Sequence, residues 1–81
     1  MFNKAVDDVI NFLLELKEDL SVPKNVKLKV DKIIAILQGS EELSIRVNKA
    51  SNELDEIADD SNMQPYTRTQ TLNIVSMLEK L

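Results

Sequence analysis

DLSVPKNVK, residues 19–27, and DSNMQPYTR, residues 60–68, are two versions of one short stretch of this sequence. Each begins with aspartate, ends eight residues later with a basic residue, and contains one proline. Proline has no N–H to donate and a fixed φ, so it suits the first turn of a helix and not its interior. Each stretch therefore predicts a short link that ends one helix and starts the next.

Apolar residues recur at the spacing of an amphipathic helix on both sides of each link. This spacing predicts helices over residues 2–20, 23–38 and 41–59, and a fourth helix from residue 65 to the end of the chain. The predicted apolar stripes consist, helix by helix, of Phe2, Val6, Val9, Leu13, Leu16 and Leu20; Val26, Val30, Ile33, Ile34 and Leu37; Leu43, Val47, Ala50, Leu54 and Ile57; and Thr67, Thr71, Ile74, Leu78 and Leu81.

The segment between the second and third predicted helices contains Gly39, the only glycine in the chain. We expect Gly39 to follow the second helix with a positive φ. Ser40 is the expected N-cap of the third helix, with Glu41 and Glu42 in its first turn, where the helix dipole favours acidic side chains. Glu42 and Arg46 have the i,i+4 spacing of a favourable ion pair.

A shift of 41 residues aligns the first half of the chain with the second. Identical residues then meet at Val6 and Val47, Asn11 and Asn52, Leu13 and Leu54, Glu15 and Glu56, Asp19 and Asp60, Ile33 and Ile74, and Leu37 and Leu78. Because polar positions match as well as apolar ones, the alignment predicts two pseudo-repeats, residues 1–40 and 41–81. Short links make neighbouring helices antiparallel, and a closed bundle buries all four stripes. The expected fold is one all-α domain over residues 1–81, a four-helix up-and-down bundle made of two tandem helical hairpins.

Composition excludes several kinds of chemistry. The 81 residues include no histidine, no cysteine and one glycine, which removes zinc sites, histidine proton relays, thiol nucleophiles and glycine-rich phosphate loops. We therefore expect neither enzymatic activity nor a cofactor. No apolar run approaches the roughly 20 residues that span a bilayer, and no signal peptide is evident, so we expect no membrane partner and a cytoplasmic location.

The two aspartates that begin the repeated stretches, Asp19 and Asp60, sit at helix C-termini, where the dipole disfavours an anion. One interpretation is that each caps or bridges into the next helix, where it meets Lys27 or Arg68. A second is that the two loops form one recognition site. A third is a catalytic carboxylate–guanidinium pair. The acidic segment LDEIADD, residues 54–60, is either a solvated face or a cation site, although it lacks the glycine turn of a calcium loop.

A lysine-rich segment, KNVKLKVDK, opens the second predicted helix. Lys24, Lys27, Lys29 and Lys32 spread over more than half of the helix circumference, so they form a diffuse patch. Helix N-termini bind phosphates, and Arg68 begins the other proline-led helix, so a composite anion site is one interpretation. Solvated lysines are the other.

Five apolar residues lie away from the predicted stripes: Leu14, Leu28, Ile45, Ile36 and Met77. The last two occupy equivalent positions of the two pseudo-repeats. Such residues indicate either wider burial of the second and fourth helices or a surface that contacts a partner.

The segments EDLSVPKNVK and IRVNKASNELDEIADDSNMQPYTRTQTLNIVSMLEKL, taken with the chain length, resemble a family of short, uncharacterised archaeal all-helical proteins. The most specific parts are the turn at residues 22–26 and the turn that runs from Asp60 to Thr69. The resemblance implies a four-helix bundle in an archaeal cytoplasm and supplies no activity, cofactor or functional residue.

Three functions follow as hypotheses. The first is a non-enzymatic helical interaction module that forms homo-oligomers or binds a protein partner. The second is an RNA- or ribosome-associated accessory protein that uses the lysine-rich helix and Arg68. The third, an enzyme acting through a carboxylate, is disfavoured by composition. The candidate interaction surface consists of Asp19, Lys24, Lys27, Lys29, Lys32, Asp60 and Arg68.

Overall fold

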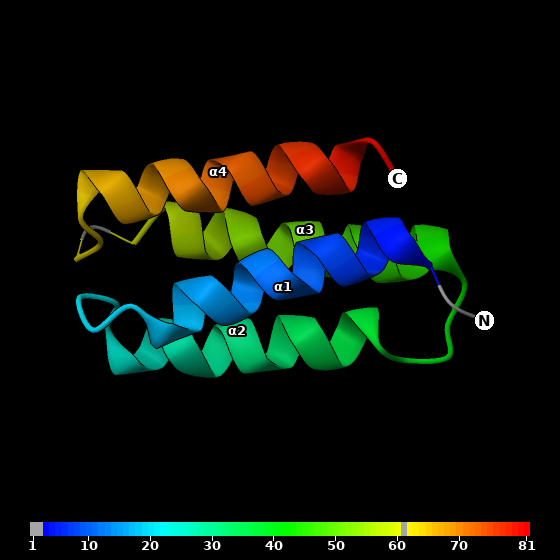
Figure 1. Ribbon diagram of the computed structural model, residues 1–81, viewed down its shortest axis with the longest axis horizontal. Coiled ribbons are helices and arrows are strands. Elements are labelled where there is room, and N and C mark those ends of the chain that lie inside the picture. Colours follow the sequence, from blue (N-terminus) through cyan, green and yellow to red (C-terminus); the bar gives the residue numbers. More distant parts are fainter. Residues whose placement is uncertain (1–2, 61) are drawn as a thin grey trace.

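The computed structural model describes residues 3–60 and 62–81, which form four helices joined by short links (Figure 1). The helices are α1 (Lys4–Glu18), α2 (Lys24–Leu37), α3 (Leu43–Ala58) and α4 (Pro65–Glu79). Each lies where the apolar spacing predicts it; α4 begins at the predicted residue, and the other helix ends move inward by one or two residues. No strand occurs in the part of the chain that the structure describes.

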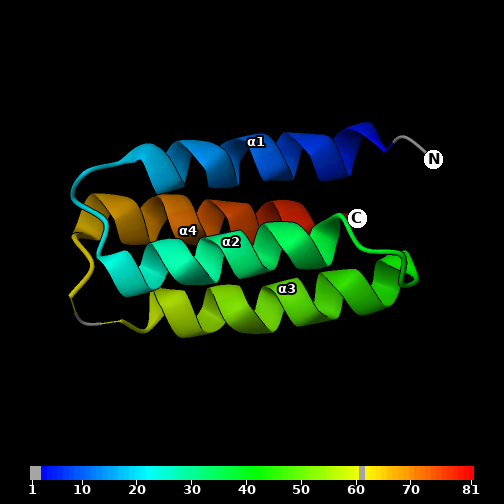
Figure 2. The same cartoon turned by 90° about the horizontal axis from the view of Figure 1, so that it is seen from below.

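The four helices form a closed ring in which each packs against two neighbours: α1 against α2, α2 against α3, α3 against α4, and α4 against α1. The α1–α2 and α3–α4 links lie at one end of the bundle, and the α2–α3 link lies at the other (Figures 1 and 2). The bundle measures 35 × 19 × 17 Å. The prediction of an all-α, up-and-down bundle made of two tandem hairpins is confirmed.

The core contains most residues of the predicted stripes, and its positions recur 41 residues apart. The pairs in which both residues are buried are Val9 and Ala50, Leu13 and Leu54, Leu16 and Ile57, Val22 and Met63, Val26 and Thr67, Val30 and Thr71, Ile33 and Ile74, and Leu37 and Leu78. Equivalent residues of the two hairpins therefore occupy equivalent depths. A duplication of residues 1–40 as 41–81 would produce this recurrence and stays a prediction. Phe2, the first residue of the predicted stripe, lies outside the described residues.

The start and end of α1 are fixed by local hydrogen bonds. Asn3 is its N-cap, because the Val6 N–H donates to Asn3 Oδ1 at 3.2 Å. The helix ends at Glu18, and the chain turns away from the helical path at Asp19. Leu20, which helical spacing places on the buried stripe, is consequently 94% exposed, so that part of the prediction is wrong.

The predicted caps of the α2–α3 link are also wrong. Gly39 does not have a positive φ, because α2 ends in a tight turn in which the Gly39 N–H donates to the Ile36 carbonyl at 3.1 Å. The N-cap position of α3 is Glu42 rather than Ser40, and the first turn of α3 holds no acidic side chain. The extra length of the link therefore places Glu41 and Glu42 before the helix and not in it.

Arg46 holds this link together in place of the expected ion pair with Glu42. Its Nε donates to the Glu41 carbonyl and its Nη1 to the Leu37 carbonyl, both at 2.8 Å. Leu37 ends α2, so one guanidinium on α3 satisfies carbonyls at the end of α2 and in the link. Arg46 thus ties the second hairpin to the first.

Candidate functional site

The two aspartate loops share one hydrogen-bonding pattern. Asp19 Oδ1 accepts hydrogen bonds from the Ser21 N–H at 2.9 Å and from Ser21 Oγ at 2.7 Å. Asp60 Oδ1 accepts one from the Asn62 N–H at 2.8 Å. Each aspartate therefore forms an Asx turn that reverses the chain before the next helix. This bonding favours the aspartates despite the unfavourable helix dipole.

Two further contacts link Asp60 to neighbouring helices. Arg68 Nη2 donates to the Asp60 carbonyl at 2.9 Å, and Asn25 Nδ2 donates to Asp60 Oδ2 at 3.3 Å. In the other loop, the hydrogen bonds from Ser21 lower the pKa of Asp19, with a smaller contribution from the charge of Lys27. Asp60 therefore contacts α2 and α4, whereas the Asp19 carboxylate bonds within its own loop and makes no ion pair with Lys27 among the described residues.

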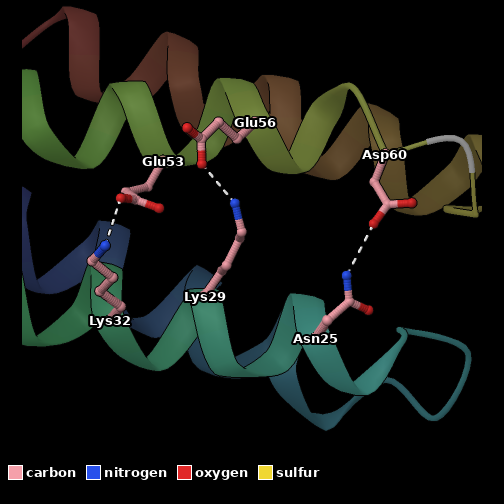
Figure 3. A network of polar contacts seen from close by, with 6 residues as sticks. All are labelled: Asn25, Lys29, Lys32, Glu53, Glu56 and Asp60. Carbon is pink, nitrogen blue, oxygen red and sulfur yellow. Dashed lines mark hydrogen bonds and ion pairs between the residues drawn. The ribbon is translucent and has the colours of Figure 1, made fainter.

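Lysines of α2 meet glutamates of α3 along the line where the two helices touch, the α2–α3 seam (Figure 3). Lys29 Nζ lies 2.6 Å from Glu56 Oε2, and Lys32 Nζ lies 2.9 Å from Glu53 Oε1. The hydrogen bond between Lys29 and Glu56 raises the pKa of the lysine and lowers the pKa of the glutamate. Half of the predicted lysine patch is therefore engaged in ion pairs within the chain.

The line of contact between α1 and α4, the α1–α4 seam, holds different residues at the corresponding positions. Adding 41 to a residue number in α2 gives the equivalent residue of α4, and subtracting 41 from a residue number in α3 gives the equivalent residue of α1. Each position of the α2–α3 seam therefore has a counterpart in the α1–α4 seam. The corresponding pairs, with the α2–α3 residue first, are Asn25 and Tyr66, Lys29 and Gln70, Lys32 and Asn73, Glu53 and Phe12, Glu56 and Glu15, and Asp60 and Asp19. Both lysines of the bridged seam thus become neutral amides, and one of its glutamates becomes an aromatic residue.

A groove of about 360 Å³ lies along the α1–α4 seam at these positions. It is lined by Phe12, Glu15, Leu16, Tyr66, Thr69, Gln70, Asn73, Ile74 and Met77. The side chains of Leu16 and Ile74 are buried beneath it, whereas Phe12 and Tyr66 remain 49% and 69% exposed. Gln70 Nε2 donates to Tyr66 Oη at 3.2 Å, which ties the tyrosine to its own helix. We call this feature the α1–α4 groove.

The groove has a simple chemical character. Glu15 is the one charged residue in its lining, and the remaining side chains are aromatic, aliphatic or neutral polar. A second hollow, of about 210 Å³, continues along the same seam toward Lys80 and shares Met77 with the first. The α1–α4 seam is therefore hollow where the α2–α3 seam is bridged.

The predicted candidate surface and the groove are different parts of the molecule. The aspartate loops, Arg68 and the lysines lie at one bundle end and along α2, and the groove contains none of them. Of the groove residues, sequence reasoning singled out Met77 as a possible partner contact. It missed Phe12 and Tyr66, although the signal was present: at these positions the second pseudo-repeat departs in chemistry from the first.

The described residues contain no group of three acidic side chains placed to hold a metal ion, and the acidic segment 54–60 is not gathered into one. In the same residues, no helix has both the length and the apolar content of a membrane span.

Fold and surface together define the class of the protein: an antiparallel four-helix bundle with ion pairs along the α2–α3 seam and a groove along the α1–α4 seam. The chain belongs to the uncharacterised protein family UPF0147, whose family model matches residues 2–81. The predicted membership of a short, uncharacterised archaeal family is thereby confirmed.

Relatives match over nearly the whole chain. A UPF0147 protein of Thermoplasma acidophilum is 38% identical over 76 residues, which cover 93% of this chain and 86% of the relative. A UPF0147 protein of Methanocaldococcus jannaschii is 39% identical over 77 residues, covering 94% and 75% of the two chains. A crystal structure of a UPF0147 protein from Thermoplasma acidophilum superposes with a TM-score of 0.90 at 37% identity, covering 96% of this chain and 93% of that one.

Proposed function

We propose that this protein is a non-enzymatic interaction module that docks a protein partner in the α1–α4 groove. The observation that carries the proposal is the difference between the two corresponding seams. Ion pairs join α2 to α3, whereas aromatic and aliphatic side chains line a hollow between α1 and α4. Because exposed ion pairs add little to stability, this difference changes the chemistry of the surface more than the stability of the fold.

The composition of the groove supports the proposal. Cores of protein interfaces are enriched in aromatic residues and methionine and depleted of charged residues. The groove contains two aromatic residues and a methionine, Phe12, Tyr66 and Met77. It contains only one charged residue, Glu15. Contact with a partner would remove exposed aromatic surface from water, which is favourable by about 25 cal/mol for each Å² buried.

The alternative of an RNA-binding protein is not favoured by any contact described above. Phosphate binding needs cations that are available to the ligand. Two of the four lysines on α2 already pair with glutamates of α3, and Arg68 donates to a backbone carbonyl.

Site-specific photo-crosslinking in cells that naturally express the protein tests the docking groove. A photoreactive amino acid at Thr69, which lines the groove, is expected to form a covalent adduct with a defined protein. The same amino acid at Asn52, which is exposed on α3, is the matched control and is expected to form none.

A closed-groove variant provides the second control. Phe12→Glu, Gln70→Lys and Asn73→Lys together rebuild the charges of the bridged seam opposite Glu15. We expect the variant to keep the helical circular dichroism of the wild type, because the same side chains are accommodated between α2 and α3. The adduct from Thr69 should disappear. Equal adducts from Thr69 and Asn52, or adducts that persist in the folded closed-groove variant, would exclude the groove as the docking site.

A further inference from the structure

The outer face of α2 carries a second surface that the fold leaves uncovered. Leu28 is 62% exposed, and Lys24, one helical turn earlier, lies on the same face. Lys27 is adjacent and half-buried. Unlike the other two lysines of the helix, Lys24 and Lys27 make no ion pair within residues 3–60 and 62–81. We call Lys24, Lys27 and Leu28 the α2 patch.

The α1–α4 groove lacks the chemistry that this patch offers. In the bridged seam, Glu56 receives the ammonium group of Lys29 at 2.6 Å. The corresponding Glu15 has no ion pair with any described residue. The groove beside it is mostly apolar and exposes two aromatic side chains. An occupant with an apolar side chain and a lysine one helical turn away would therefore complement the groove in both charge and polarity.

We propose that the α1–α4 groove of one copy of this chain binds the α2 patch of a second copy. The proposal rests on the proposed function and names its partner. Leu28 of the docked copy enters between Phe12 and Tyr66 of the first, and Lys24 of the docked copy lies beside Glu15. The partner is thus chosen by charge complementarity between two surfaces that neither the core nor the ion pairs use.

The order of helices makes this contact intermolecular. Helix α2 packs against α1 and α3 but not against α4, so the patch cannot reach the groove of its own chain. A contact between two different surfaces is head-to-tail, and it produces a ring if the rotation closes or a filament if it does not.

Mixing two variants tests the proposal by sedimentation velocity of the purified full-length chain. Wild type is expected to sediment with a mass that rises above 9.2 kDa as its concentration increases. Leu28→Glu removes the patch, and the closed-groove variant removes the groove. Each variant alone should associate about 10- to 100-fold more weakly than wild type, as the loss of a buried leucine predicts. At concentrations where wild type begins to associate, each should therefore have the mass of one chain. An equimolar mixture should form a species of two chains, because each variant retains the surface that the other lacks.

Charge reversal adds an independent measurement. Lys24→Glu and Glu15→Lys are each expected to weaken wild-type association ~2- to 5-fold, the range for an exposed ion pair. Lys49→Glu, on α3, is the control and should have no such effect. Helical circular dichroism verifies that every variant is folded.

Three results overturn the proposal: a wild type that remains at 9.2 kDa up to about 1 mM, an association that Leu28→Glu leaves unchanged, or a mixture that forms no two-chain species. None of these results by itself excludes the groove as a docking site, because a Thr69 cross-link to a different protein would then identify its partner. The proposed function fails on the cross-linking test alone: when Thr69 forms no adduct, when Asn52 forms an equal one, or when the adduct persists in the closed-groove variant.

Discussion

Alanine substitutions at Leu13 and Leu20 should affect stability differently, although helical spacing places both residues on one apolar stripe. Leu13 is fully buried on α1, whereas Leu20 is 94% exposed in the α1–α2 link. Leu13→Ala should cost about 3–5 kcal/mol, the range measured for buried leucines. A domain of this size has a free energy of unfolding of roughly 4–12 kcal/mol, so this loss is a large fraction of the total. Because each kcal/mol shifts the melting temperature of such a domain by about 4–8 °C, Leu13→Ala should lower the melting temperature by at least ~12 °C. Leu20→Ala should change stability by less than ~0.5 kcal/mol.

Urea denaturation followed by far-ultraviolet circular dichroism measures both free energies of unfolding. The experiments belong at low micromolar protein, because self-association would add stability to the folded state. Leu54→Ala supplies an internal comparison, since Leu54 occupies the equivalent buried position of the second hairpin and should lose a similar amount. A destabilisation of Leu20→Ala as large as that of Leu13→Ala would mean that α1 continues past Glu18, and the account of the Asp19 turn would be wrong.

Three further substitutions test the links and the bridged seam. Asn3→Ala removes the N-cap of α1 and should cost ~1 kcal/mol in the same urea assay, with Asn3→Ser close to wild type. Arg46→Ala should lower the free energy of unfolding by about 1–3 kcal/mol. Arg46→Lys should not restore this loss, because one ammonium group cannot reproduce the two directed hydrogen bonds of the guanidinium. Full rescue by lysine would contradict the role assigned to Arg46. Glu56 has a lowered pKa in the folded state, so its contribution is present above its ordinary pKa of ~4.3 and is lost as the pH falls through the folded value. The urea midpoints of wild type and Glu56→Gln should therefore differ at pH 7 and converge in acid, and a gap that is constant with pH would argue against the Lys29–Glu56 pair.

The fold could be predicted because helical periodicity is carried by many residues at once. Even α4, whose stripe includes the polar Thr67 and Thr71, was placed correctly, and both threonines are buried. Periodicity does not determine where a helix stops, since that depends on a few hydrogen bonds in the link. Leu20 was misplaced because the Asp19 turn ends the helical path before it. Gly39 was misassigned because glycine permits a positive φ without requiring one.

The groove was harder to predict than the fold because it arises from a difference between two helix pairs. No motif marks Phe12 or Tyr66, and each alone is an ordinary exposed aromatic residue. They become informative when the bundle shows that they occupy the positions of Glu53 and Asn25 on the opposite seam. The lysine cluster, by contrast, is conspicuous in the sequence, but half of it serves ion pairs within the chain.

The start of α1, the end of α4 and the α2–α3 link all lie at one end of the bundle (Figure 1). A circularly permuted chain that starts at residue 41, with residue 81 joined to residue 1 by a short flexible linker, would run α3, α4, α1 and α2 around the same ring. Each hairpin would keep its own aspartate turn, and only the connection between hairpins would be exchanged. We therefore expect the two hairpins to form the same bundle in either order along the chain.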